Sequence, residues 1–168
     1  PVIKGIQSSR EYYVAMVPLR LIPSLFMFND SSLPPEMRAQ RLLNKSRVPT
    51  ITKYLLENSD NYTFSSLTAS IDRIVKFQPI PAEKENSRIG YINIPADTKI
   101  LINDGQHRRV AIIEALKQKP ELGYETISVV FYIDTGLERS QQMFSDLNRY
   151  ASKPSGSLNI LYDHRDDF

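Results

Sequence analysis

The chain has 168 residues, of which 41% are hydrophobic and 24% are charged, values typical of one globular domain with its own core. It contains no cysteine, which excludes disulfides, thiolate metal sites and cysteine nucleophiles. The net charge of +2 permits nucleic-acid binding without requiring it, and no apolar run reaches the ~20 residues needed to cross a bilayer.

The first part of the chain predicts one strand and two helices. Residues 12–17 form a short apolar and aromatic run, which is typical of a buried strand. Two prolines and a glutamate open residues 34–43 and favour a helix there. A second helix is predicted from Arg47, with apolar side chains at helical spacing and its end at residues 58–61.

The second part mixes strands and helices without a regular βαβ repeat, which predicts an α+β fold with a mixed sheet and flanking helices. The expected elements are strands at 67–77, 90–94, 99–102 and 127–133, a polar loop at 79–88, and helices at 110–119 and 137–151. The apolar, β-branched run 127–133 predicts a central strand. In the last helix we expect Leu137, Phe144, Leu147 and Ala151 to share one apolar face.

We expect a single domain over residues 1–168. The chain begins on Pro1 and stops at Phe168, just after two aspartates. We interpret these ends as those of an N-terminal fragment of a longer protein.

The segment with the most chemistry runs from Asp104 to Arg109. A predicted strand leads through Asp104 and Gly105 into a predicted helix. Such a turn directs backbone N–H groups and the positive helix end at one place, where anions and above all phosphates bind. His107, Arg108 and Arg109 add donors suited to phosphate.

Asp104 has three possible roles in this pattern: it can cap the helix, hold an arginine, or coordinate a metal beside a phosphate. Gly105 allows a positive φ or a close approach of another group. The same residues also suit a plain capped helix, because Asp-Gly followed by polar residues begins many helices. From the residues alone, phosphate binding and a capped helix remain equally good interpretations.

The segment from Asp104 to Ala111, read Asp-Gly-Gln-His-Arg-Arg-Val-Ala, resembles the signature of the DGQHR domain. Residues 143–149 and 153–155 resemble the second block of that family. Residues 17–22 and 47–51 lie where the family has its first block and a helical insertion. The resemblance covers nearly the whole chain, and its spacing is similar to that of DndB, the regulatory family of the bacterial DNA phosphorothioation system.

This resemblance implies a core similar to the ParB and sulfiredoxin fold, carrying a helical insertion. In those proteins the matching glycine–arginine turn binds nucleotide phosphates. Gln106 stands where sulfiredoxin has its catalytic cysteine, so thiol repair is excluded here. The resemblance implies a nucleotide or phosphate site formed by Gly105, Gln106 and Arg109.

Asn148, Lys153 and Ser155 follow the last predicted helix and can converge on the same phosphate. The alternative is a polar helix end that leads into a turn at Pro154. The family resemblance favours the site. Residues 163–167 contain potential metal ligands, but five adjacent polar residues do not converge easily on one ion.

The densest group of basic residues lies on the two predicted N-terminal helices. It would form a DNA-backbone surface with salt-dependent affinity and little sequence reading. The alternative is a solvated helix face. The residues of this group are Arg38, Arg41, Lys45, Arg47 and Lys53.

Two functions fit these observations. By resemblance, the first is a cytoplasmic DNA-binding transcriptional regulator, a repressor of the phosphorothioation genes. Its partners would be double-stranded DNA and other phosphorothioation proteins, with no membrane involved. No chemistry need occur in this case, because the turn only has to organise a phosphate.

The second function is a DNA-stimulated nucleotide hydrolase with the DGQHR turn as its active site. Its cofactor would be a nucleoside triphosphate with Mg²⁺. Asp104 would hold the metal or orient water, His107 would transfer a proton, and Arg108 would neutralise charge on the transferred phosphoryl group.

Overall fold

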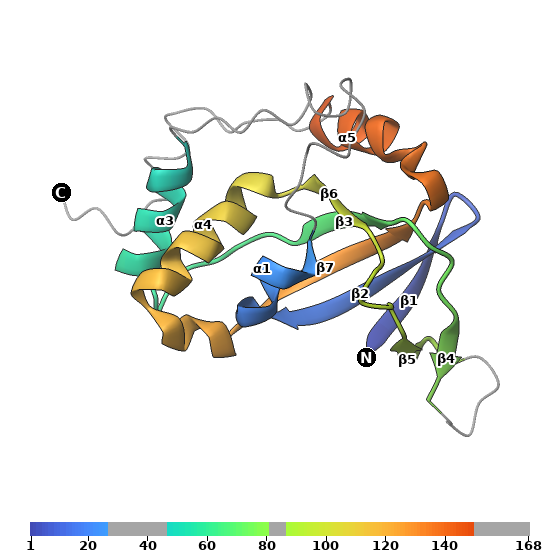
Figure 1. The fold of residues 1–168 in the computed structure, drawn as a ribbon, viewed down its shortest axis with the longest axis horizontal. Helices are drawn as coiled ribbons and strands as arrows, with labels where there is room; N and C mark the ends of the chain where they lie inside the picture. The colour runs from blue at the N-terminus through green and yellow to red at the C-terminus, as the bar shows by residue number, and fades with distance from the viewer. Residues whose placement is uncertain (27–46, 81–86, 150–168) are drawn as a thin grey trace.

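The computed structural model describes residues 1–26, 47–80 and 87–149 (Figure 1). Its centre is a seven-stranded mixed sheet with the strand order β4-β5-β1-β2-β7-β3-β6. The strands are β1 (Val2–Gln7), β2 (Arg10–Pro18), β3 (Leu67–Ile71), β4 (Phe77–Pro79), β5 (Ile89–Ile92), β6 (Ile100–Asp104) and β7 (Thr126–Ile133). The predicted α+β class is confirmed.

The apolar strand β7 lies inside the sheet, as its composition predicts. It pairs antiparallel with β2, with Val14 opposite Val130, and parallel with β3, with Thr68 opposite Val130. Strand β6 then closes this side by pairing antiparallel with β3. Strand β6 lies at the edge of the sheet. After its last residue, Asp104, the chain leaves the sheet and enters α4.

The helices of the described residues lie on both faces of the sheet. They are α1 (Ile22–Leu25), α3 (Arg47–Glu57), α4 (Gln106–Gln118) and α5 (Ser140–Arg149), with 3-10 turns η1 (Leu19–Leu21), η3 (Pro120–Tyr124) and η4 (Thr135–Leu137). Helices α1 and α4 cover one face, and α3 packs against α4 (Figure 1). Buried Ile112 and Ala115 of α4 join the same apolar core as Val129 and Phe131 of β7.

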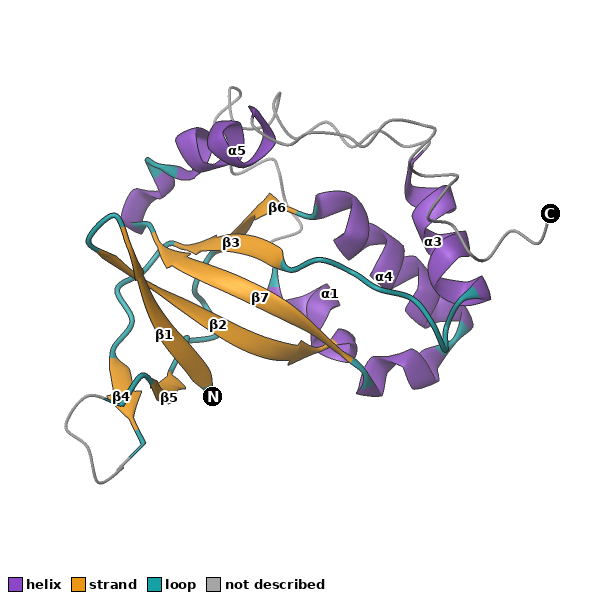
Figure 2. Cartoon of the chain, turned by 180° about the vertical axis from the view of Figure 1, so that it is seen from behind, coloured by secondary structure: helices purple, strands orange, loops and turns teal. Residues whose placement is uncertain are grey.

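Helix α5 packs against β6 on the other face. Leu101 and Leu137 form a small apolar cluster there, apart from the main core. Seen from behind, α5 lies over the β3–β6 side, and none of the described helices lies in front of β1, β2 and β7 (Figure 2). The described helices therefore cover one face of the sheet and only part of the other.

The prediction of one strand over residues 67–77 is wrong. Strand β3 ends at Ile71, and residues 77–79 form β4 at the opposite edge of the sheet. The chain leaves the sheet at Asp72, whose carboxylate accepts a hydrogen bond from the backbone N–H of Gly136. The Asp72 side chain is therefore held by a loop 64 residues further along the chain. The apolar pattern of residues 67–77 did not reveal this contact.

The last helix also differs from its prediction over residues 137–151. Leu137 has φ +57° and lies in η4, so α5 begins only at Ser140. Leu147 is 42% exposed and does not share a buried face with Leu137. The predicted helix at 34–43 and Ala151 lie outside the described residues.

Candidate phosphate site at the start of helix α4

The turn between β6 and α4 depends on glycine at position 105. Gly105 is the N-cap of α4 and has φ +95°. A Cβ at this position would lie 2.4 Å from Cδ2 of buried Leu67, and 3.0 Å from Nη2 of Arg108. A left-handed conformation and the lack of room for a side chain together account for glycine at this position.

Asp104 and Arg108 form an ion pair across this turn. The Arg108 Nη2 donates to Asp104 Oδ2 at 2.6 Å, and the Arg108 side chain is only 18% exposed. Of the three roles considered for Asp104, the structure therefore shows the one that holds an arginine. The Arg108 Nε is buried and has no hydrogen-bond partner among the described residues.

The N-cap of α4 is a glycine, and among the described residues no side-chain hydrogen bond caps the first turn. The backbone N–H of Arg109 donates to the carbonyl of Gly105 at 2.9 Å, which closes the first helical turn. Gln106 and His107 are the two half-buried residues that open the helix. Within the described part of the chain, no carboxylate caps the positive end of this helix, and such an end favours an anion.

The start of α3 lies beside the start of α4. Arg47 opens α3 and is close enough to His107 to act on its charge, whereas Lys119 and Ser59 join the other ends of the helices through a 2.7 Å hydrogen bond. The two helices therefore run in the same direction and present both positive ends on one side (Figure 1). Arg109 adds a guanidinium there, which donates to the Phe26 carbonyl at 3.4 Å.

The pKa of His107 is lowered by the groups around it. Burial lowers it from its ordinary value, the nearby positive charge of Arg47 lowers it further, and Asp104 opposes the shift. Burial disfavours the charged imidazolium, and like charges repel. These effects favour the neutral imidazole, and an anion bound beside it would oppose them by favouring the protonated form.

A cavity of about 420 Å³ adjoins Arg108. Tyr54 and Phe64 line it with their rings 6.0 Å apart, and the Tyr54 hydroxyl accepts a hydrogen bond from the Thr63 N–H at 2.9 Å. The signal that would have found the cavity is tertiary, since α3, the segment after it and α4 each supply part of its wall.

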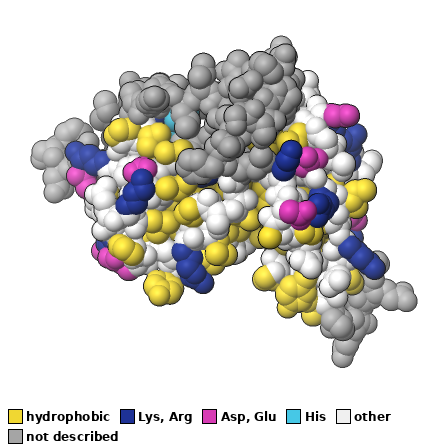
Figure 3. All heavy atoms as spheres, viewed as in Figure 1, with side chains coloured by type: hydrophobic (Ala, Val, Ile, Leu, Met, Phe, Trp, Pro, Cys, Tyr) yellow, Lys and Arg dark blue, Asp and Glu magenta, His cyan; other side chains and the backbone are white. Residues whose placement is uncertain are grey.

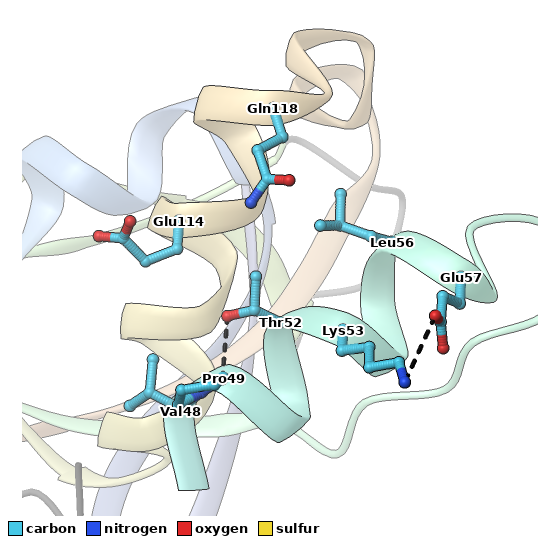
Figure 4. Close-up of a pocket in the computed structure, with 8 residues that line it drawn as sticks. All are labelled: Val48, Pro49, Thr52, Lys53, Leu56, Glu57, Glu114 and Gln118. Atoms are coloured by element: carbon cyan, nitrogen blue, oxygen red, sulfur yellow. Dashed lines mark hydrogen bonds and ion pairs between the residues drawn. The ribbon is translucent and has the colours of Figure 1, made fainter. Parts of the chain in front are cut away.

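The predicted DNA-backbone residues separate in the structure. Arg47, the first residue of α3, lies near His107 at the start of α4, but Lys53 points away and forms an ion pair with Glu57 at 3.7 Å (Figure 4). This pair borders a second cavity of about 420 Å³, which is also lined by Glu114. Arg38, Arg41 and Lys45 lie outside the described residues.

Charges of both signs alternate over the face seen in Figure 3, with no single basic patch among the described side chains. The concentration of positive groups at the α3 and α4 starts is therefore a local feature. It comes from Arg47, Arg109 and the Arg108 that is paired with Asp104, together with the two helix ends.

The remaining predicted phosphate ligands are placed only in part. Asn148 belongs to α5, which packs against β6, the strand that leads into the turn. Its side chain, Lys153 and Ser155 lie outside the described residues. Within the described ranges, no group of three His, Asp or Glu side chains could hold a metal ion.

Comparison with known families supports the resemblance seen in the sequence. The family model of DndB, described as DNA-sulfur modification-associated, matches residues 1–168. The chain belongs to the DndB family. Searches of curated proteins and of solved structures each found no significant match.

The DndB assignment places the chain among proteins associated with DNA sulfur modification. The likeness of its core to ParB and sulfiredoxin stays a prediction, as do the roles assigned to the DGQHR residues. In the described part of this DndB-family chain, no helix is long and apolar enough to span a membrane.

Proposed function

We propose that this chain is a DNA-binding transcriptional regulator, a repressor of the DNA sulfur-modification genes. The observation that carries the proposal is the shared positive end of α3 and α4, where Arg47, His107, Arg108 and Arg109 surround an α4 start without a side-chain cap. Helix ends and arginines are the groups that hold DNA phosphates. The family's association with DNA sulfur modification supplies the biological setting.

The proposal needs no catalysis. Phosphate contacts fix a protein on the duplex, whereas sequence is read elsewhere by base contacts or DNA shape. Duplex DNA and other sulfur-modification proteins are the partners that the family suggests. Because the ion pair of Asp104 with Arg108 leaves the backbone at the start of α4 uncapped, one phosphate oxygen can approach there without displacing a carboxylate cap.

The test is duplex binding measured by fluorescence anisotropy over a range of salt concentrations, with promoter DNA of the modification genes and a scrambled duplex. Arg47→Ala should weaken binding by roughly three- to tenfold and reduce the salt dependence by about one counterion. Arg88→Ala, at an exposed position next to β5, is the matched control and should bind as the parent does. Equal loss in both variants would contradict a site at the α3 and α4 starts.

The second candidate function is the nucleotide hydrolase. The cavity beside Arg108 favours it, because an aromatic wall next to an arginine suits a nucleoside whose phosphates reach the start of α4. Mg²⁺ in such sites is held largely by phosphate oxygens, so one carboxylate, that of Asp104, fits the need. His107 would accept the proton of the attacking water, and Arg108 would neutralise charge on the phosphoryl group.

A thermal-shift titration with ATP, GTP and CTP, with and without Mg²⁺, tests this candidate, followed by phosphate release in the presence of duplex DNA. Asp104→Asn separates the two functions. For a regulator it removes a negative charge near DNA, so duplex binding is kept or strengthened. For a hydrolase it abolishes phosphate release in a protein that still folds and binds nucleotide.

A further inference from the structure

The cavity at the ion pair of α4 adjoins the proposed phosphate site along one face of α3. Its lining residues Thr50, Ile51 and Tyr54 follow Arg47 by three, four and seven positions. Side chains at this spacing lie on the same face of a helix. Because Arg47 is close enough to His107 to act on its charge, this face runs from the start of α4 into the cavity. A DNA phosphate bound at the two helix starts therefore has the cavity as its neighbour.

The wall of this cavity is mostly apolar. Ile51 and the rings of Tyr54 and Phe64 supply its carbon surface, and three residues with aliphatic hydroxyls complete it. The Tyr54 hydroxyl is already bonded to the Thr63 N–H, at 2.9 Å. Among the described residues that line the cavity, none is a carboxylate, and Arg108 is the charged one. The cavity therefore offers apolar surface beside one positive group.

Arg108 is held at the cavity wall and is not fully bonded. Its Nη2 donates to Asp104 at 2.6 Å, and its side chain is 18% exposed. Its Nε is buried and has no hydrogen-bond partner within the described part of the chain. An arginine has five N–H donors, and its delocalised charge is weakly hydrated, so it pairs well with a large, polarisable anion. The cavity therefore suits an anionic group that tolerates apolar surroundings.

Sulfur-modified DNA contains such a group. In a phosphorothioate linkage, sulfur replaces one non-bridging oxygen of the phosphate, and the linkage keeps its negative charge. Sulfur is larger and more polarisable than oxygen, accepts hydrogen bonds more weakly, and makes favourable contacts with the edges of aromatic rings. Moving it from water to an apolar wall therefore costs less than moving a phosphate oxygen. The family's association with DNA sulfur modification makes this the modified DNA that the chain would meet.

We propose that this cavity is a sulfur pocket, formed by Ile51, Tyr54, Phe64 and Arg108, which receives the sulfur of a phosphorothioate linkage while the other non-bridging oxygen meets the start of α4. The inference rests on the DNA binding proposed above and adds sulfur-modified DNA as the preferred ligand. The cavity volume of about 420 Å³ exceeds that of one sulfur atom, so the apolar edge of the adjoining deoxyribose enters with it. A repressor with this preference would couple its control of the modification genes to the extent of modification.

The proposed geometry predicts a preference for one of the two stereoisomers of the linkage. The two non-bridging atoms of a bound phosphate point in different directions. Only one configuration at phosphorus therefore places sulfur in the pocket and oxygen at the helix start. In the other configuration sulfur faces the backbone N–H groups, which bind oxygen more strongly. A difference between stereoisomers thus distinguishes a sulfur pocket from a general effect of sulfur on the duplex.

Fluorescence anisotropy of the 168-residue chain with promoter duplexes of one sequence tests the inference. Each duplex carries a single stereopure phosphorothioate, placed at successive linkages. At one or a few linkages, one stereoisomer should bind about two- to tenfold more tightly than the unmodified duplex, which is the ratio that one sulfur–aromatic contact provides. Its counterpart should gain nothing. Affinities that equal the unmodified duplex at every linkage, or equal gains for both stereoisomers, overturn the inference.

Two variants of α3 test the position of the sulfur. Ile51→Thr places a hydroxyl in the pocket and should bring the ratio of affinities for modified and unmodified DNA close to one. Leu56→Thr is the matched control, because Leu56 is likewise half-buried on α3 but lines the second cavity, and it should keep the ratio. Thermal unfolding verifies that both variants are folded. A ratio that survives Ile51→Thr would place the sulfur elsewhere and overturn the inference.

Failure of this inference is distinguishable from failure of the proposed function. Binding of unmodified duplex that depends on Arg47, without any preference for sulfur, leaves the regulator standing and removes the sulfur pocket. Displacement of the modified duplex by free adenosine would assign the cavity to a base and would also remove the sulfur pocket. A chain that binds no duplex, modified or unmodified, overturns both proposals.

Discussion

Two strand-to-helix connections of the molecule each contain an aspartate and a glycine, but the aspartate interacts with the helix start in only one of them. At the first, β6 leads through Asp104 and Gly105 into α4. At the second, β7 leads through Asp134 and Gly136 to α5. Both glycines have positive φ, +95° and +78°.

The two aspartates have different hydrogen-bond partners. Asp134 is buried and accepts hydrogen bonds from the Arg139 N–H, at 3.1 and 3.2 Å, and from the Ser140 hydroxyl at 2.9 Å. It therefore holds the start of α5 within the protein. Asp104 instead holds Arg108 and gives no cap to α4.

The difference shows how one sequence pattern serves two purposes. A carboxylate at a helix start neutralises the positive end and satisfies its N–H groups. At α5 the aspartate does so, which makes that corner a plain capped helix. At α4 the aspartate turns to an arginine, and the helix end remains available to an outside anion.

The glycines offer the sharpest way to test this comparison. Gly105→Ala should destabilise the fold by roughly 2–4 kcal/mol, because a positive φ costs about 1–2 kcal/mol and the new Cβ would overlap Leu67. Gly136→Ala should cost only about 1–2 kcal/mol, since the nearest atom to its Cβ is 3.7 Å away. Urea denaturation of both variants measures the difference. Equal costs would mean that Leu67 yields easily and that the α4 corner is not tightly built.

For the aspartates we expect the larger loss of stability at the α5 connection, the reverse of the result expected for the glycines. Asp134→Ala removes the α5 cap and leaves the buried Ser140 hydroxyl without its acceptor, at a cost of roughly 2–3 kcal/mol. Asp104→Ala removes a partly exposed ion pair, worth less than about 1 kcal/mol. Thermal and urea unfolding of both proteins provide the measurement. A large loss from Asp104→Ala would show that this pair is structural and would weaken its assignment to a site.

Much of the fold could be predicted from local pattern. Local composition and turn-forming residues located three features to within a few residues. These are the strand β7, the helix that begins at Arg47, and the strand–turn–helix at Gly105. The failures occur where a distant contact decides the structure. Strand β3 ends at Ile71, and the carboxylate of the next residue, Asp72, accepts a hydrogen bond from the distant Gly136 N–H, a contact that no local pattern reports.

The candidate site was predictable to a similar degree. The signature identified the turn, the glycine and its arginines, since these lie next to each other in the chain. It did not predict that α3 would bring Arg47 to His107, or that Tyr54 and Phe64 would form a cavity beside Arg108. These relations depend on the packing of α3 on α4, which the spacing of apolar residues in either helix does not specify.

The smallest expected effect is a response to pH that only the α4 corner should show, because it carries His107 and the α5 corner carries no histidine. The pKa of His107 is lowered in the folded protein, so near its ordinary value of 6.5 the unfolded chain binds more protons. The stability contribution of His107 should therefore fall as the pH drops through that range. A bound phosphate reverses the shift, because an opposite charge favours the imidazolium.

DNA binding should consequently take up a proton at His107 and become tighter from pH 8 to pH 6, by less than about tenfold per pH unit. His107→Gln should flatten this dependence while keeping affinity at pH 8, and Arg88→Ala should leave the slope unchanged. Anisotropy titrations at constant ionic strength measure both variants. A slope that survives His107→Gln would assign the proton to another group and would detach the imidazole from the phosphate site.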